Sequence, residues 1–119
     1  GQIIPSREFY DYEAKYIDTS TRLVIPAPLD EDLTERVREI SIATFRATGC
    51  SGLARVDMFV NTESKSVRVS EVNTMPGFTD VSMYPKLWEA SGVPYSVLVE
   101  KLVYLALERK DALERRHWV

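Results

Sequence analysis

The sequence predicts a mixed α/β (α+β) fold in which an antiparallel sheet is packed by helices. Two alternating segments, 53–60 and 67–74, flank a polar turn, which is the pattern of a β-hairpin. Three segments repeat apolar residues at helical spacing, at about 30–48, 83–91 and 95–109. A length of 119 residues suits one small domain or part of a larger one.

The N-terminal segment is predicted to be a short strand followed by a long loop. The strand is Gln2–Pro5, and the residues from there to 22 sustain neither a period of 2 nor one of 3.6. Loops of this length are uncommon in compact domains and often act as lids or binding loops, so this segment is a candidate for such a role. The alternative interpretation is a frayed end created by excision. Arg22–Pro26 is a brief β-branched run ended by proline, which predicts a second strand.

The predicted helices have recognisable ends. Asp30 is a good N-cap, acidic residues follow it, and Gly49 ends an amphipathic helix whose apolar stripe should pack on the sheet. The Pro76-Gly77 pair predicts a loop after the hairpin. The last helix continues beyond 95–109 as a charged extension through Arg116.

The composition excludes several function classes. Lys and Arg number 15 against 18 Asp and Glu, so no basic excess is available to meet the phosphates of a nucleic acid or a membrane. The single Cys50 cannot form an internal disulfide, which makes a reducing cytoplasm the default. No apolar stretch approaches the roughly 20 residues that cross a bilayer. The chain starts at Gly1 without an initiator Met or a signal sequence, so we expect it to be excised from a longer protein.

Charged residues on the hairpin predict a metal site. Side chains two residues apart on a strand share a face, and a turn centred near Ser64 places Asp57 opposite Glu71. The same register places Arg55 opposite Asn73. Two opposed carboxylates repel unless a cation or a proton lies between them, and an all-oxygen set that includes the Asn73 carbonyl suits Mg²⁺ or Mn²⁺. A phosphate-bearing substrate is the natural companion of such a metal. The alternative is a solvent-facing strand pair in which Arg55 bridges the two acids.

The loop after the hairpin predicts an anion site. Pro76-Gly77 leaves backbone N–H groups open to a ligand, and Ser82 stands immediately before a helix. A helix N-terminus beside a serine can bind a carboxylate or a phosphate. The alternative is that Ser82 is an ordinary N-cap.

Residues 52–59 (GLARVDMF), 71–79 (EVNTMPGFT) and 82–85 (SMYP) form three motifs in a fixed order. Together they resemble the C-terminal part of D-alanine:D-alanine ligases of the ATP-grasp superfamily. Residues 9–16 (FYDYEAKY) are similar to the mobile ω-loop of that family. The resemblance covers nearly the whole chain, and the ordered set is far more specific than a lone Glu-x-Asn.

The resemblance implies metal-binding and catalytic roles for the hairpin and the loop. Asp57, Glu71 and Asn73 match the ligands of two Mg²⁺ (or Mn²⁺) ions held against the ATP phosphates. Arg55 and the Gly77 backbone match the groups that stabilise the tetrahedral transition state.

It also implies substrate contacts. Ser82, with Met83 beside it, matches the site for the carboxylate of the second D-alanine. Lys15 matches an ω-loop lysine that reaches the γ-phosphate of ATP, and Tyr16 matches the loop tyrosine that closes the second substrate site. Related ligases that make a terminal D-lactate ester lack that tyrosine, so Tyr16 favours the dipeptide product.

The activity that the resemblance implies is phosphorylation of the first D-alanine carboxylate by ATP, followed by attack of the second D-alanine amine on the acyl phosphate. The product would feed peptidoglycan precursors in a bacterial cytoplasm. The expected partners are D-alanine, ATP and the rest of the parent polypeptide, itself expected to be a homodimer, with no nucleic acid and no membrane.

Two departures from the family qualify these expectations. Ser70 stands before Glu71, where family members usually have Asn. More seriously, residues 1–119 match only the C-terminal part of an ATP-grasp catalytic domain, with the strand and ω-loop at 1–22 and the sheet and helices at 23–119. The N-terminal domain and the lysines that bind the nucleotide are absent, so we expect no turnover by this chain alone. The alternatives are a non-catalytic module that binds a divalent metal or a partner, and a ligase that uses D-serine or D-lactate as second substrate.

Overall fold

The computed structural model describes residues 1–4, 22–79 and 81–116. In chain order the elements are β1 (Gln2–Ile4), β2 (Arg22–Val24), α2 (Glu31–Ala47), β3 (Arg55–Asn61), β4 (Ser66–Asn73), α3 (Met83–Ala90) and α4 (Tyr95–Arg116). The predicted mixed fold and its three helices are therefore confirmed among these residues. Each observed helix ends within about two residues of its predicted limits, and α4 includes the charged extension.

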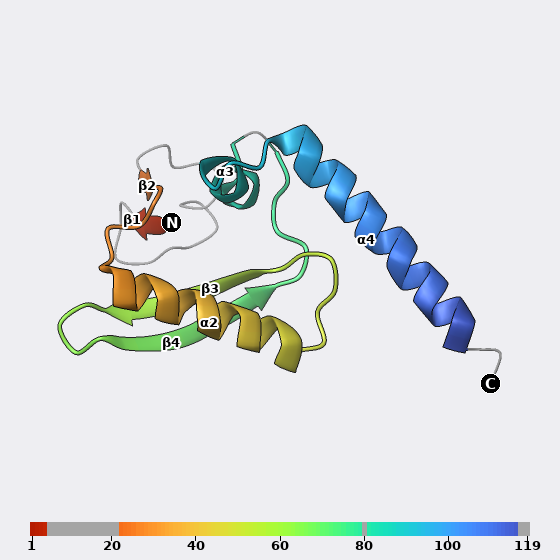
Figure 1. Ribbon diagram of the computed structural model, residues 1–119. Helices are drawn as coiled ribbons and strands as arrows, with labels where there is room; N and C mark the ends of the chain where they lie inside the picture. The colour runs from red at the N-terminus through yellow and green to blue at the C-terminus, as the bar shows by residue number, and fades with distance from the viewer. Residues whose placement is uncertain (5–21, 80, 117–119) are drawn as a thin grey trace.

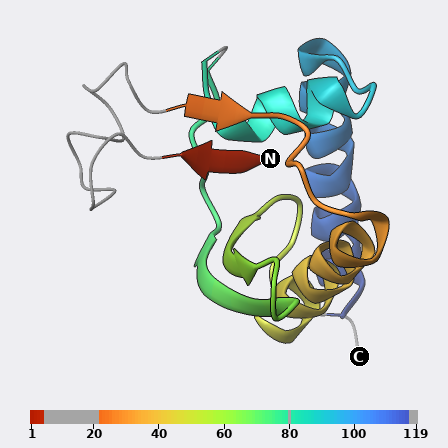
Figure 2. The ribbon, with the colours of Figure 1, turned by 90° about the vertical axis from the view of Figure 1, so that its left-hand side faces the viewer.

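The strands form two separate two-stranded antiparallel sheets, β1–β2 and β3–β4, which corrects the expectation of one sheet. The β1–β2 pair lies beside α3, whereas α2 lies across the β3–β4 hairpin (Figures 1 and 2). Gly1, which precedes β1, lies close to α3, because a Cβ on Gly1 would come within 2.9 Å of the Leu87 side chain and 3.4 Å of the Met83 side chain. The first sheet thus packs on a helix and does not extend the hairpin.

Local capping explains why α2 begins and ends where it does. The Asp30 side chain accepts a hydrogen bond of 2.8 Å from the backbone N–H of Leu33, as an N-cap does. Glu31 and Asp32 follow in the first turn, where negative charge favours the helix dipole. Gly49 has a φ of +66°, a left-handed conformation that glycine adopts without strain. The sequence-based limits of this helix are confirmed.

The hairpin is shorter at its start and tighter at its turn than predicted, with strands at 55–61 and 66–73 in place of 53–60 and 67–74. The Asn61 side-chain oxygen accepts hydrogen bonds from the N–H groups of Glu63 and Ser64, at 3.0 and 2.8 Å. This Asx turn closes the hairpin, and β3 therefore ends at Asn61, one residue later than predicted. Lys65, next in the turn, forms a 3.2 Å ion pair with Asp30 and so joins the turn to the start of α2.

A β-bulge divides the hairpin into two registers. Asn61 faces Ser66 at the turn, and Met58 faces Val69. Between Met58 and Asp57 the register shifts by one residue, because Ser70 is an extra residue on β4. Beyond the bulge Asp57 faces Glu71, as the sequence predicted, although the turn is not centred on Ser64.

The molecule is elongated because α4 projects away from the other elements (Figure 1). Its Cα radius of gyration is 16.5 Å, against about 13.5 Å expected for a compact chain of this length. In α4 Leu98 is buried, with 3% of its surface exposed. The same helix exposes many large apolar side chains: Tyr95, Val97, Val99, Val103, Tyr104, Leu105, Leu107 and Leu113.

No single helix in the described parts of the chain is long and apolar enough to span a membrane. By length and composition α3 and α4 pass that test only as a pair, and they are bent by 105° at the break between them.

Candidate functional site

Three charged side chains meet on one face of the hairpin. Arg55 donates two hydrogen bonds to Asp57, from Nε to Oδ1 at 2.7 Å and from Nη2 to Oδ2 at 2.6 Å. The same Nη2 lies 3.6 Å from Oε1 of Glu71 on the neighbouring strand. The Arg55 and Asp57 side chains are 19% and 27% exposed, so solvent screens their bidentate pair less than it screens a surface ion pair. The predicted cluster of Arg55, Asp57 and Glu71 therefore forms.

Arg55 lies where the repulsion between the carboxylates would otherwise be greatest. Asp57 and Glu71 are direct partners in the register, and the guanidinium contacts both. The bridging arrangement considered as the alternative is thus the one present in this structure. The opposition of two carboxylates does not by itself require a metal ion here, because Arg55 supplies the positive charge.

The donor set nevertheless fits a hard divalent cation. A carboxylate offers about four lone-pair sites, so Asp57 can accept from Arg55 and still bind a metal. Asn73 faces Arg55 in the register, and its side-chain oxygen accepts a 3.0 Å hydrogen bond from the Met75 N–H, which fixes the amide and leaves one lone pair. In the part of the chain that the structure describes, no three or more His, Cys, Asp or Glu side chains lie together so that they could hold a metal ion by themselves. Two carboxylates and an amide oxygen are a set that Mg²⁺ accepts, completing its shell with water and phosphate.

The loop that follows brings Gly77 against Ser82. A Cβ on Gly77 would lie 2.9 Å from the Ser82 Oγ, closer than a side chain can approach without a shift. The φ angle of Gly77 is not positive, so its backbone conformation does not require glycine. Glycine is required because Ser82 lies too close to leave room for a Cβ. The two residues that the sequence assigned to the loop and to the helix start are therefore neighbours in space.

Ser82 is the N-cap residue of α3, but its side chain makes no capping hydrogen bond. One reason is that Pro85 occupies the third helical position and has no N–H to donate. The Ser82 Oγ instead accepts from the Thr79 N–H at 3.1 Å and lies 2.8 Å from the Thr79 Oγ1. The alternative of an ordinary N-cap is wrong, and the hydroxyl belongs to the loop.

Aromatic residues that the sequence analysis did not select fix this loop. The Phe78 ring lies between those of Tyr84 and Tyr95, with centroids 5.9 and 5.3 Å away. The Tyr95 hydroxyl donates to the Phe78 carbonyl at 3.1 Å, and Trp88 packs edge-on against Tyr84. Burial raises the pKa of Tyr84. No regular period links a loop residue to two later helices, so the sequence offered only the apolar character of Phe78 beside Gly77 as a signal.

Three predicted site residues remain, namely Met83, Lys15 and Tyr16. Met83 begins α3, and its Cε lies 3.4 Å from the position of a Cβ on Gly1, so its side chain extends toward the β1–β2 pair. Lys15 and Tyr16 lie outside the described residues. Their predicted contacts with ATP and the second substrate stay predictions.

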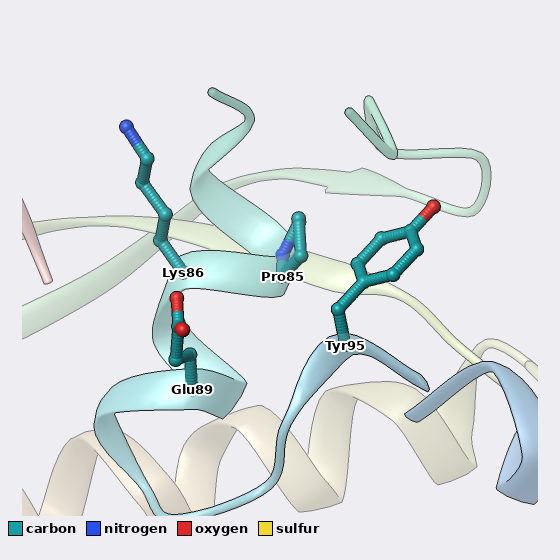
Figure 3. A pocket seen from close by; sticks show the side chains of 4 residues that line it. All are labelled: Pro85, Lys86, Glu89 and Tyr95. Carbon is teal, nitrogen blue, oxygen red and sulfur yellow. The ribbon is translucent and has the colours of Figure 1, made fainter. Parts of the chain in front are cut away.

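A depression of about 190 Å³ lies between α3 and the start of α4 (Figure 3). Pro85, Lys86, Glu89 and Tyr95 line it. None of these is a predicted site residue. The described residues for which the sequence predicts a chemical role lie on the hairpin face and from Gly77 to Met83, and none of them lines this depression.

Comparison with known proteins assigns the chain to a family. Residues 1–104 match the family model described as D-ala D-ala ligase C-terminus. The D-alanine–D-alanine ligase of Geobacillus thermodenitrificans is 57% identical over 109 residues, which are 92% of this chain and 30% of that protein. The ligase of Natranaerobius thermophilus is 52% identical over 115 residues, 97% of this chain and 32% of that protein.

Solved structures give the same result. The D-alanine–D-alanine ligase of Bacillus anthracis superposes with a TM-score of 0.75 at 40% identity, over 92% of this chain and 36% of that one. A D-alanine–D-alanine ligase of Bacillus anthracis complexed with ATP gives a TM-score of 0.67 at 38% identity, over 72% of this chain and 30% of that one. The chain spans about a third of the length of the relatives it matches. By its family match and these identities, this chain belongs to the D-alanine–D-alanine ligase C-terminal family.

Proposed function

We propose that the full-length protein containing this chain joins two D-alanine molecules to D-alanyl-D-alanine at the expense of ATP. Family membership supports the reaction class, since the similar proteins carry the name D-alanine–D-alanine ligase. The observation that carries the proposal is the hairpin face, where Asp57 opposes Glu71 and Arg55 opposes Asn73. In this proposal the chain supplies the C-terminal part of an ATP-grasp catalytic domain.

ATP and two Mg²⁺ or Mn²⁺ ions are the proposed cofactors. A related ligase has been solved complexed with ATP, which supports the nucleotide. Asp57, Glu71 and the Asn73 amide oxygen would hold the metal ions, because they form the all-oxygen donor set on the hairpin face. When bound, such ions neutralise the negative charge of the ATP phosphates.

The reaction has two proposed steps. In the first, an oxygen of the first D-alanine carboxylate attacks the γ-phosphorus of ATP, and ADP leaves with the electron pair of the broken P–O bond. In the second, the amine of the second D-alanine attacks the acyl carbon, a proton leaves the nitrogen, and inorganic phosphate departs. Negative charge develops on the acyl oxygen in this second step.

Arg55 and the Gly77 N–H are proposed to stabilise that oxyanion. The Arg55 guanidinium is held in one orientation by its two bonds to Asp57, so little reorganisation is needed as charge develops. Ser82 and Met83 are proposed to bind the carboxylate of the second D-alanine. Lys15 and Tyr16 are proposed to reach the γ-phosphate and to close the second substrate site.

The wider setting follows from the same proposal. D-Alanyl-D-alanine would supply peptidoglycan precursors in the bacterial cytoplasm, and the ligase would act as a homodimer. The isolated chain is expected not to turn over, because the similar ligases are about three times as long.

The test is ADP release by the full-length protein. Release should require D-alanine together with Mg²⁺ or Mn²⁺ and should stop when the metal is chelated. Asp57→Asn keeps the shape of the side chain while removing its charge, and it should raise the Mg²⁺ concentration needed for half-maximal activity. Asp32→Asn is the matched control, since it removes the same charge from a side chain on α2 that is 91% exposed and whose ion pair is a 3.9 Å contact with Lys65 in the hairpin turn.

The outcomes separate the alternatives. Release that depends on D-serine or D-lactate as second substrate would change the specificity but keep the ATP-dependent ligation. Absence of any ADP release with D-alanine, while the protein still binds Mg²⁺ through Asp57, would favour a non-catalytic metal-binding module.

A further inference from the structure

Thr79 and Ser82 are joined by three hydrogen bonds at the start of α3. The Ser82 N–H donates to the Thr79 carbonyl at 3.0 Å, and the Thr79 N–H donates to the Ser82 Oγ at 3.1 Å. The third bond joins the two hydroxyls, 2.8 Å apart, and geometry allows either to be the donor. Which hydroxyl donates decides what Ser82 can offer to a ligand.

A count of lone pairs and hydrogens limits the choice. A serine hydroxyl has one hydrogen and two lone pairs. In Ser82 the Thr79 N–H already occupies one lone pair. If Ser82 donates to Thr79, its only hydrogen is used and nothing remains to bind an anion. If Thr79 donates to Ser82, both lone pairs of Ser82 are filled and its hydrogen is left to point outward.

An ionised carboxylate only accepts hydrogen bonds, so it can bind only the second arrangement. In that arrangement Thr79 O–H donates to Ser82, and Ser82 O–H donates to the carboxylate. Hydrogen bonds in such a chain polarise and strengthen one another. Gly77 completes the arrangement, because a Cβ there would lie 2.9 Å from the Ser82 Oγ and would displace it.

We propose that Thr79 is a positioning residue that makes Ser82 a hydrogen-bond donor to the carboxylate of the second substrate. This inference rests on the proposed function, which supplies the carboxylate. Thr79 acts through Ser82 and does not itself touch the substrate. The observation behind it is that the Ser82 Oγ turns away from its own helix and toward Thr79.

The experiment measures steady-state ADP release by the full-length protein, with separate KM values for the first and second D-alanine. Thr79→Val removes the hydroxyl but keeps a β-branched side chain of the same shape. Loss of one hydrogen bond should raise the second KM by about 2- to 12-fold. The first KM should not change and kcat should stay within about twofold, because the bond serves binding in ground and transition states alike. Thr79→Ser, which keeps the hydroxyl, should restore the second KM.

A double-mutant cycle tests whether Thr79 acts through Ser82. Once Ser82→Ala has removed the serine hydroxyl, Thr79→Val should add no further increase in the second KM. Additive effects in the cycle would overturn the inference, as would an unchanged second KM in Thr79→Val or equal losses in both KM values and kcat. The proposed function fails separately, if the unsubstituted protein releases no ADP with D-alanine, and the inference then falls with it.

Discussion

The contact between Gly77 and Ser82 allows a quantitative prediction for Gly77→Ala. The added Cβ would lie 2.9 Å from the Ser82 Oγ, so the hydroxyl must move. It cannot move freely, because it is hydrogen-bonded to both the N–H and the Oγ1 of Thr79. Each such bond contributes about 0.5 to 1.5 kcal/mol. Losing both should therefore cost about 1 to 3 kcal/mol, which lowers kcat/KM for the second D-alanine by about 5- to 150-fold.

The assay is D-alanine-dependent ADP release by the full-length protein. The control is Gly77→Ala combined with Ser82→Ala, which removes the Oγ but keeps the Ser82 Cβ at an ordinary distance of 3.5 Å. In the Ser82→Ala background, Gly77→Ala should add little further loss. A Gly77→Ala variant within twofold of the unsubstituted protein would refute the reasoning, and so would an equally large effect of Gly77→Ala in both backgrounds.

Three further predictions concern the stability and association of the chain. Tyr95→Phe removes the hydroxyl that donates to the Phe78 carbonyl. The free energy of unfolding, measured by chemical denaturation, should fall by about 0.5 to 1.5 kcal/mol. An unchanged denaturation midpoint would contradict a role for this bond. The backbone N–H of Leu33 first, and Lys65 second, hold the pKa of Asp30 below its usual range. The ionised Asp30 carboxylate therefore stabilises the folded state above about pH 4, and this stabilisation is lost as the pH falls through the lowered pKa. Asp30→Asn keeps a side-chain oxygen for the helix cap but has no carboxylate to titrate. Its melting temperature should therefore fall less steeply between pH 5 and 2 than that of the unsubstituted protein, and an equally steep fall would show that other groups cause it. The exposed apolar side chains of α4 should make the 119-residue chain self-associate, and a monomer at all concentrations in sedimentation would contradict this.

The charged cluster was largely predictable because strands have a simple period. Residues two apart share a face, so Arg55 and Asp57 had to lie together on β3 whatever the rest of the fold. Their partners depended on the register, and here the prediction was right although the turn is not centred where expected. The reason is the bulge at Ser70, which restores the opposition of Asp57 and Glu71. A signal existed, since Val69 and Val72 break the two-residue alternation at that point.

The loop site was less predictable because its contacts join residues with no regular spacing. The sequence indicated a loop at Pro76-Gly77 and a helix start at Ser82. It did not indicate that the Ser82 hydroxyl turns to Thr79, or that Phe78 packs between two aromatic rings. Such contacts depend on how α3 and α4 pack against the loop.

The sequence by itself determined the helix limits, the existence of the hairpin and the face that its charges share. These features depend on local causes, namely caps, turn residues and the periods of helix and strand. Only the tertiary structure decided that the strands form two sheets, that Arg55 bridges the carboxylates, and that the Ser82 hydroxyl belongs to the loop. Those outcomes depend on packing between distant segments, whose free energies no local pattern encodes.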